Sequence, residues 1–339
     1  MYRFISSFKA TQQLTRTQYL KMTNAFTTKS GKPLNIGTGT GTKWQWAKKG
    51  RPEDEQNEVH QDLVDQISLA IKTGFRHIDT AETYTTHPEV AAAVKVSGIP
   101  REDLWITTKY IPGSKVIGST ASSKGPIDTI DQALTTLDTE YLDLFLLHTP
   151  FFDPELSHGL TITSAWKEAI QAKKDGKVRH IGVSNFAIPH LEETYEAAEG
   201  NKEYYPEFNQ LEFHPYLQNQ SKDIIKYCQD NNILVEAFGP LTPLFRIKEG
   251  EKEVTDHPLT KLLPKLSEKY GKTDAQILLR YTLQKGILPI TTSSKEQRIR
   301  ESLEAYDFKL DEEDVKLIDD EGATYKFRGF FGKNYEQYE

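Results

Sequence analysis

Segments with the apolar pattern of β-strands alternate along this chain with segments whose apolar residues recur every three to four positions, as in helices packed on one face. The expected strands are Gly39–Thr42, Arg76–Thr80, Leu104–Thr108, Leu142–Leu147, His180–Ser184, Phe208–Glu212, Leu234–Ala237 and Leu288–Thr292. The expected helices include Val59–Lys72, Ile127–Leu137, Thr163–Lys174, Ile224–Asn231 and Glu296–Ala305, and Thr86–Glu89 has the form of a capping box that starts another. Eight strand–helix units favour an α/β fold, a single (β/α)8 TIM barrel.

A doubly wound open sheet is the main alternative, because it also alternates strands with helices. Such sheets usually carry a Gly-x-Gly-x-x-Gly turn after the first strand. The glycine-rich segment Gly37–Thr42 has Thr42 where the third glycine belongs. The sequence therefore favours the closed barrel, in which the chemistry is carried at the carboxyl ends of the strands.

The two ends of the chain differ from the repeats between them. Residues 1–22 contain Arg3, Lys9, Arg16 and Lys21 but no acidic residue, which suits a mitochondrial presequence or a disordered extension. We divide the chain into this extension and a barrel domain, residues 23–339, and expect a cytoplasmic protein, or a mitochondrial one if residues 1–22 are a presequence. The barrel domain should begin with an N-terminal hairpin around Ser30 and Gly31, and end in a C-terminal loop over the barrel mouth.

The composition excludes several classes of protein. Cys228 is the single cysteine, so the chain has no internal disulfide and no zinc-type Cys/His spacing, and we expect no metal. A net charge of −7 argues against a nucleic-acid partner. Apolar runs such as Leu144–Leu147 are far too short to span a membrane. We expect a small-molecule partner and leave monomer and homodimer open.

Four ionisable residues follow three consecutive expected strands: Asp79 and Tyr84 after the second, Lys109 after the third and His148 after the fourth. In a barrel these strand ends converge on one small volume. A tyrosine has a reference pKa of about 10, and a nearby cation lowers that value. We therefore expect Asp79 to keep Lys109 charged, Lys109 to lower the pKa of Tyr84, and His148 to orient a substrate carbonyl.

The segments that carry these residues resemble the aldo-keto reductase family. The resemblance runs from about Phe26 to the end of the chain. It rests on the motifs Gly74–Tyr84, Leu104–Lys109, Tyr141–His148, Ile181–Asn185 and Pro206–Pro215, which lie in the family's order and at the family's spacing. Within the family, Glu236–Leu241 and Leu288–Lys295 are most similar to yeast reductases of conjugated polyketones and α-keto amides.

The resemblance implies an NADPH-dependent enzyme with a catalytic tetrad of Asp79, Tyr84, Lys109 and His148. Tyr84 would give a proton to the carbonyl oxygen while a hydride passes from the nicotinamide to the carbonyl carbon. Phe238 would stack on the nicotinamide where the family usually has tyrosine. The implied cofactor-binding residues are Gly41, Thr42, Ser184, Asn185, Gln210, Phe238, Gly239, Pro240, Leu241, Thr292, Ser293, Ser294, Lys295 and Arg298.

The chain departs from the family pattern near the expected adenosine 2′-phosphate. Thr292 stands where the family commonly has lysine, and Ser302 where it has an adenine-contacting asparagine. Arg298 matches the family's phosphate-binding arginine, and Lys295 is close enough in sequence to replace the missing charge. Cations in a first helical turn oppose the helix dipole unless an anion is bound, which favours phosphate binding.

The expected substrate pocket is aromatic, with Tyr110, Phe151 and Phe152 and the tail residues Tyr325, Phe327, Phe330 and Phe331. Without a spare cation such a pocket suits α-dicarbonyl, α-keto amide or keto-lactone compounds. Lys43 stands where many relatives have tryptophan, so the sequence does not decide whether the aromatic wall of the pocket continues at that position. The alternatives are an aldehyde or xylose-type pentose reductase, and a regulatory subunit that binds NADPH without turnover, against which the complete tetrad argues.

Overall fold

Eight parallel strands close into a barrel, as predicted. The structure is a computed structural model that describes residues 26–56, 58–249 and 252–339, so the predicted extension, residues 1–22, lies outside the described residues. Neighbouring strands follow the order β1-β10-β7-β6-β5-β4-β3-β2. The barrel strands are β1 (Gly37–Gly39), β2 (His77–Asp79), β3 (Trp105–Tyr110), β4 (Leu142–Leu147), β5 (Val178–Ser184), β6 (Phe208–Glu212), β7 (Leu234–Phe238) and β10 (Ile287–Thr291).

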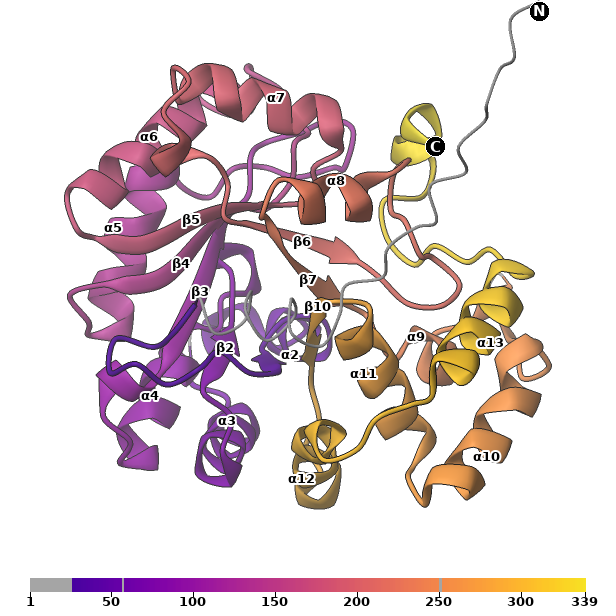
Figure 1. Ribbon diagram of the computed structural model, residues 1–339. Helices are drawn as coiled ribbons and strands as arrows, with labels where there is room; N and C mark the ends of the chain where they lie inside the picture. Colours follow the sequence, from indigo (N-terminus) through magenta and orange to yellow (C-terminus); the bar gives the residue numbers. More distant parts are fainter. Residues whose placement is uncertain (1–25, 57, 250–251) are drawn as a thin grey trace, which may run out of the picture.

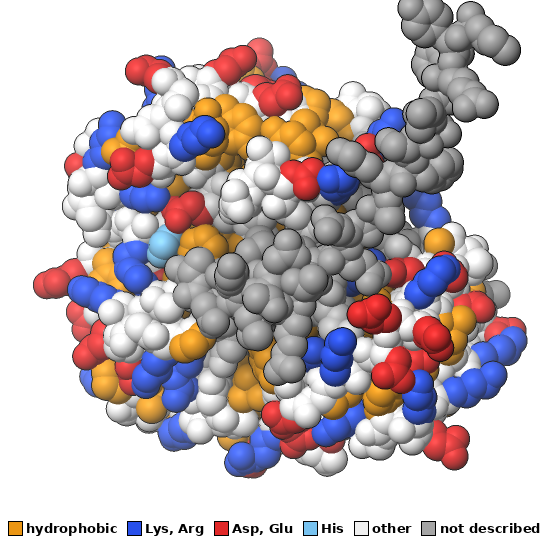
Figure 2. Space-filling view, viewed as in Figure 1, with side chains coloured by type: hydrophobic (Ala, Val, Ile, Leu, Met, Phe, Trp, Pro, Cys, Tyr) orange, Lys and Arg blue, Asp and Glu red, His pale blue; other side chains and the backbone are white. Residues whose placement is uncertain are grey.

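Helices form a ring around these strands (Figure 1). Acidic and basic side chains are intermingled on the visible surfaces of α10 and α13 (Figure 2). Among the described residues, no helix is both long enough and apolar enough to cross a bilayer. The helices are α2 (Lys43–Lys49), α3 (Gln61–Thr73), α4 (His87–Ser97), α5 (Pro126–Leu137), α6 (Ile162–Lys174), α7 (Ile188–Ala197), α8 (Ile224–Asp230), α9 (Thr242–Phe245), α10 (Pro258–Tyr270), α11 (Asp274–Gln284), α12 (Glu296–Leu303) and α13 (Glu312–Ala323).

Shorter elements complete the described chain. A two-stranded antiparallel hairpin, β8 (Lys248–Glu249) with β9 (Lys252–Glu253), follows α9. Single-turn 3₁₀ segments lie at Glu53–Glu55, Glu82–Tyr84, Arg101–Asp103, Lys202–Tyr204 and Glu304–Tyr306, and a longer one at Gly332–Tyr338 ends the chain. The predicted helices are confirmed, with boundaries that differ by at most two residues.

The first strand was predicted two to three residues too far along the chain. It spans Gly37–Gly39 instead of beginning at Gly39. Thr42, the predicted last strand residue, has a φ of +46°, and α2 begins at the next residue. A side chain at Gly37 would lie 2.5 Å from Ile290 Cδ1 and 2.9 Å from His77 Nδ1. The glycine is therefore required where β1 passes between its two neighbours.

The two ends of the barrel are closed differently. The predicted N-terminal hairpin is present, with Thr27 bridging Pro33 and Gly31 at a φ of +89°. Phe26 packs on Trp105 and Phe208, the first residues of β3 and β6, so the hairpin covers the amino ends of the strands. Beneath it the barrel is filled by an apolar cluster of Leu34, Trp105, Leu144, Leu146, Phe208, Leu234 and Leu288.

The C-terminal segment lies over the opposite, carboxyl end of the strands, as predicted. The backbone amides of Gly329 and Phe330 donate hydrogen bonds of 2.7 and 3.1 Å to the carboxylate of Glu212, the last residue of β6. The hydroxyl of Tyr335 donates to the backbone carbonyl of Asn185, which follows β5. These contacts fix the segment at the barrel mouth.

The predicted capping box at Thr86–Glu89 is absent. Thr86 precedes α4 without capping it through its side chain, and its hydroxyl contacts those of Thr40 and Thr80 instead. Glu89 is fully buried and forms an ion pair with Lys48 of α2, with both carboxylate oxygens within 3.0 Å of the ammonium. The glutamate is therefore used to hold α2 against α4, because a buried ammonium requires a charged partner.

We predict that Lys48→Met lowers the free energy of unfolding by about 3–5 kcal/mol, because Glu89 then stays buried without its cation. Lys226→Met is the matched control, since Lys226 pairs with Asp230 at the exposed surface and such pairs contribute less than about 1 kcal/mol. Urea unfolding of both variants measures the difference. Equal, small losses would show that Glu89 finds another donor.

Candidate active site

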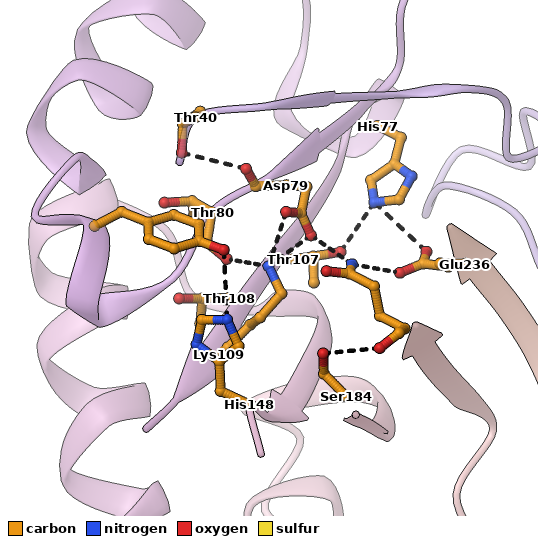
Figure 3. Close-up of polar contacts among 12 residues, drawn as sticks. Thr40, His77, Asp79, Thr80, Thr107, Thr108, Lys109, His148, Ser184 and Glu236 are labelled. Carbon is orange, nitrogen blue, oxygen red and sulfur yellow. Dashed lines mark hydrogen bonds and ion pairs between the residues drawn. The ribbon is translucent and has the colours of Figure 1, made fainter. Parts of the chain in front are cut away.

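A buried ion pair lies at the carboxyl ends of β2 and β3 (Figure 3). The Lys109 ammonium lies 2.8 Å from both carboxylate oxygens of Asp79 and 2.9 Å from the Thr80 carbonyl oxygen. The pairing of β2 with β3 places Asp79 beside Thr107, two residues before Lys109 on the same face of β3. All three ammonium donors are therefore satisfied, as a fully buried lysine requires.

Tyr84 and His148 lie against this pair. Tyr84 ends the single-turn segment Glu82–Tyr84 that follows β2, and its ring centroid is 5.3 Å from the Lys109 ammonium. Its hydroxyl is 3.4 Å from Nε2 of His148, which follows β4. The backbone carbonyl of His148 accepts a 2.9 Å hydrogen bond from the Asn185 side chain. The structure thus brings together the four side chains that the sequence predicts to converge.

The charge states of these groups differ in one respect from the expectation. Lys109 lowers the pKa of the Tyr84 phenol, as predicted, but burial raises it by more, so the pKa lies above its ordinary value. Burial alone would lower the pKa of Lys109, but Asp79 and Tyr84 outweigh it and the pKa is raised. Burial and the nearby ammonium hold the pKa of His148 well below its usual range. The site therefore holds a neutral phenol and a neutral imidazole beside an ion pair.

A cavity of about 790 Å³ opens above the ion pair. Asp79, Tyr84 and His148 line it, whereas Lys109 lies fully buried below. Every residue that the resemblance assigned to the cofactor also lines the cavity, from Gly41 and Thr42 after β1 to Lys295 and Arg298 after β10. The cavity therefore spans the barrel mouth from the phenol of Tyr84 to the start of α12.

The predicted aromatic pocket residues Tyr110, Phe151 and Phe152 are not among the residues that line this cavity. Tyr110 is fully buried outside the barrel and packs against Phe152, with ring centroids 6.3 Å apart. Tyr110 neighbours Lys109 on β3, and alternate strand residues face opposite sides, so an inward Lys109 turns Tyr110 outward. Nor do Tyr325 and Phe327 of the tail line the cavity. Besides Tyr84 and His148, the aromatic residues that do line it are Trp46, Phe238, Phe245, Phe330 and Phe331.

The cavity is rich in cations, contrary to the expectation of no spare cation. Its basic residues are Lys43, Lys49, Arg246, Lys295 and Arg298, whereas Asp79 is its one acidic residue among the described residues. On a chain with a net charge of −7, this distribution creates a local positive potential that favours an anionic ligand. The sequence did not reveal Trp46, Phe245 or Arg246. Trp46 lies on α2, Phe245 is the last residue of α9 and Arg246 follows it, and both helices are too short to show a periodic pattern.

Three features of the lining suit a dinucleotide. The buried hydroxyl of Thr242 lines the cavity and has no hydrogen-bond partner among the described residues. The first turn of α12 has no side-chain cap, so its amides are available to an anion. A side chain at Gly41 would lie 2.8 Å from the Tyr84 ring, so the glycine keeps the chain close to the phenol.

A second polar layer lies beneath the cavity. The side-chain nitrogen of Gln210 donates to Asp79 and to Glu236, at 2.9 Å each. Glu236 is fully buried and its other oxygen is 3.8 Å from Nε2 of His77. His77, Asp79 and Glu236 offer potential metal ligand atoms within 4.8 Å of one another, but both Asp79 oxygens already accept hydrogen bonds from Lys109. Glu236 was not predicted as a site residue. Its position two residues after Leu234, whose side chain points into the barrel, is the sequence signal that places an acidic side chain inside the barrel.

Burial and repulsion by Asp79 raise the pKa of Glu236 from 4.5 to about 8. The folded carboxyl then keeps its proton while the unfolded one loses it, so this group's contribution to stability is present below pH 4.5 and is lost as the pH rises to about 8. We predict that the unfolding free energy of the parent falls relative to that of Glu236→Gln across this range, by up to about 1.4 kcal/mol per pH unit. Parallel pH profiles of the two proteins in urea unfolding would contradict the raised pKa.

Comparison with known proteins matches residues 35–321 to the Aldo/keto reductase family model. The NADPH-dependent alpha-keto amide reductase of Saccharomyces cerevisiae is 40% identical over 302 residues, which cover 88% of this chain and 91% of the yeast protein. The NAD/NADP-dependent indole-3-acetaldehyde reductase of Schizosaccharomyces pombe is 36% identical over 276 residues, 81% of this chain and 89% of that protein.

A solved structure also resembles the fold. The Bombyx mori aldo-keto reductase in complex with NADP superimposes with a TM-score of 0.69 at 27% sequence identity, over 87% of this chain and 92% of that one. The similarity therefore covers the whole barrel rather than one motif.

Proposed function

The chain belongs to the aldo/keto reductase family, and on this premise we propose that it is an NADPH-dependent reductase that converts ketones or aldehydes to alcohols with Tyr84 as proton donor. One observation carries the proposal. The neutral phenol of Tyr84 lines a cation-rich cavity directly beside the buried Asp79–Lys109 ion pair and the neutral His148 imidazole. This arrangement can deliver a proton to a carbonyl oxygen and stabilise the phenolate that remains.

The lining residues support NADPH as the cofactor. When bound, NADPH supplies the hydride that reduces the carbonyl carbon. Ser184, Asn185 and Gln210 would hold the nicotinamide carboxamide, and Phe238 would stack on its ring. The loop Gly239–Thr242 would hold the pyrophosphate, and Lys295 and Arg298 would bind the 2′-phosphate.

Each member of the tetrad has a separate task in this proposal. Tyr84 would stay protonated until it transfers its proton to the substrate carbonyl oxygen, because burial raises the pKa of the phenol. Lys109 stays charged and attracts the phenolate after the proton has left. His148 is neutral, so its ring nitrogen can donate a hydrogen bond that orients the substrate without adding charge.

The substrates that fit this lining best are α-dicarbonyl, α-keto amide and keto-lactone compounds. Because the phosphates of the cofactor would neutralise the cations, the aromatic rings of Trp46, Phe330 and Phe331 remain for a neutral substrate. The S. cerevisiae relative acts on alpha-keto amides. The S. pombe relative acts on an aldehyde, so an aldehyde reductase is the alternative activity. Initial rates with an α-keto amide, an α-diketone, a keto lactone, an aldose and an aromatic aldehyde distinguish the two.

We predict that Tyr84→Phe lowers turnover by at least about a hundredfold but leaves NADPH binding intact, because the hydroxyl donates the proton while the ring only lines the cavity. Lys109→Met should also inactivate the enzyme, and Asp79→Asn should reduce turnover less. Tyr110→Phe is the matched control, because the Tyr110 hydroxyl is buried without a partner among the described residues and away from the cavity. Near-normal turnover of folded Tyr84→Phe would refute the assignment of the proton donor.

We also predict a preference for NADPH over NADH that depends mainly on Arg298. A charge-assisted hydrogen bond contributes about 1.5–3 kcal/mol, so Arg298→Ala should weaken NADPH binding by roughly tenfold to a hundredfold and NADH binding much less. Lys295→Ala should do the same to a smaller degree. Arg300→Ala is the control, since Arg300 lies on the same helix but pairs with Glu296 at the exposed surface. Equal weakening of both cofactors by Arg298→Ala would mean that the arginine has a structural role only.

A further inference from the structure

Glu236 is a buried acidic residue that the proposed chemistry does not use. It lies in the middle of β7, fully buried, and points into the barrel toward Asp79 (Figure 3). An apolar residue at this inward position would pack without the desolvation penalty of a carboxyl group. A polar side chain held at such a position therefore indicates a task in the neighbouring site.

Its principal contact is the side chain of Gln210, which it shares with Asp79. The Gln210 nitrogen lies 2.9 Å from Oδ1 of Asp79 and 2.9 Å from Oε2 of Glu236. A side-chain amide has two N–H donors, and these two contacts use both. The donors of Gln210 are thus fully occupied by one acidic residue on β2 and another on β7.

The two acidic residues fix different properties of the amide. Asp79 determines that the nitrogen of the Gln210 amide, and not its oxygen, points toward the ion pair. An amide oxygen in the same place would face the carboxylate that pairs with Lys109 and would be repelled by it. A single hydrogen bond still allows the amide plane to rotate about it. Glu236 supplies the second acceptor and so fixes the plane.

This arrangement leaves the side-chain oxygen of Gln210 available to a ligand. Gln210 lines the cavity, while its nitrogen is held from below by the two acidic residues. None of the hydrogen bonds found among the described residues uses this oxygen as an acceptor. It can therefore accept a hydrogen bond only from something bound in the cavity.

We propose that Glu236 is a positioning residue, which together with Asp79 locks the Gln210 amide so that its oxygen accepts a hydrogen bond from the carboxamide NH₂ of the nicotinamide. The proposal rests on the proposed function, because it takes NADPH as the cofactor. Glu236 itself does not contact the cofactor. It acts through Gln210 and sets how the nicotinamide ring is held above Tyr84.

The test measures binding rather than turnover. The ligands are NADP⁺, its 3-acetylpyridine analogue, in which a methyl group replaces the carboxamide NH₂, and adenosine 2′,5′-bisphosphate, which lacks the nicotinamide. One neutral hydrogen bond corresponds to a difference of about three- to tenfold in affinity, so the parent should bind NADP⁺ that much more tightly than the analogue. Isothermal titration calorimetry gives all three dissociation constants.

Glu236→Met removes the second acceptor at similar volume, and the preference for NADP⁺ over the analogue should then fall toward one. Binding of adenosine 2′,5′-bisphosphate should stay unchanged. Glu236→Gln should rescue the preference, because a carboxamide has the shape of the protonated carboxyl group and still offers an oxygen to Gln210. A buried acid that is only structural would move none of these ratios.

The outcomes are separable. A folded Glu236→Met that keeps the parent's preference overturns the proposal, as does equal weakening of all three ligands. If Glu236→Met does not fold, Glu236→Val, which suits a strand, takes its place. In a Gln210→Met background the Glu236 substitution should have no further effect on the ratio. A parent that binds neither NADP⁺ nor adenosine 2′,5′-bisphosphate would instead refute the proposed cofactor.

Discussion

The ion pair between Lys109 and Asp79 is the interaction on which the rest of the site depends. A lysine that is fully buried can stay charged only if its three donors are satisfied and a counter-charge lies in contact. Asp79 supplies two oxygens, and the Thr80 carbonyl supplies the third. This requires β2 and β3 to lie in one register, because a slip of one residue would turn Lys109 out of the barrel. The pairing register of β2 with β3 and the charge of Lys109 therefore depend on each other.

The positions of the neighbouring groups follow from this pair. Tyr84 approaches the ammonium from the segment after β2, and the close approach requires glycine at position 41. Gln210 is held from below because Asp79 has a lone pair left for it. His148 is neutral in part because the same ammonium repels a second positive charge. The buried ammonium thus adds to the effect of burial in keeping the imidazole neutral, and it lowers the pKa of the phenol.

How far the sequence predicted the structure depends on what determines each feature. The strands Leu142–Leu147 and Phe208–Glu212 were predicted to the residue. Leucines mark both limits of the first strand, and Phe208 marks the start of the second. The first strand was misplaced, because glycines and threonines give no alternation of apolar and polar side chains. The tetrad could be predicted because the strand ends of a barrel must converge. The aromatic wall could not, because Trp46 and Phe245 reach the cavity from short helices whose course no local pattern fixes.

The barrel interior has two layers, one of apolar side chains and one of ionisable side chains. The lower layer, with Trp105, Leu144 and Leu288, is apolar and lies under the N-terminal hairpin. The upper layer holds Asp79, Lys109 and Glu236, one cation and two acidic residues. Because burial and repulsion by Asp79 raise the pKa of Glu236 to about 8, this carboxyl group is protonated at neutral pH and the three groups have no net charge. An ionised Glu236 would repel the phenolate that Tyr84 would become in the proposed proton transfer. The proton on Glu236 therefore lets a second acidic residue position Gln210 without raising the energy of that phenolate.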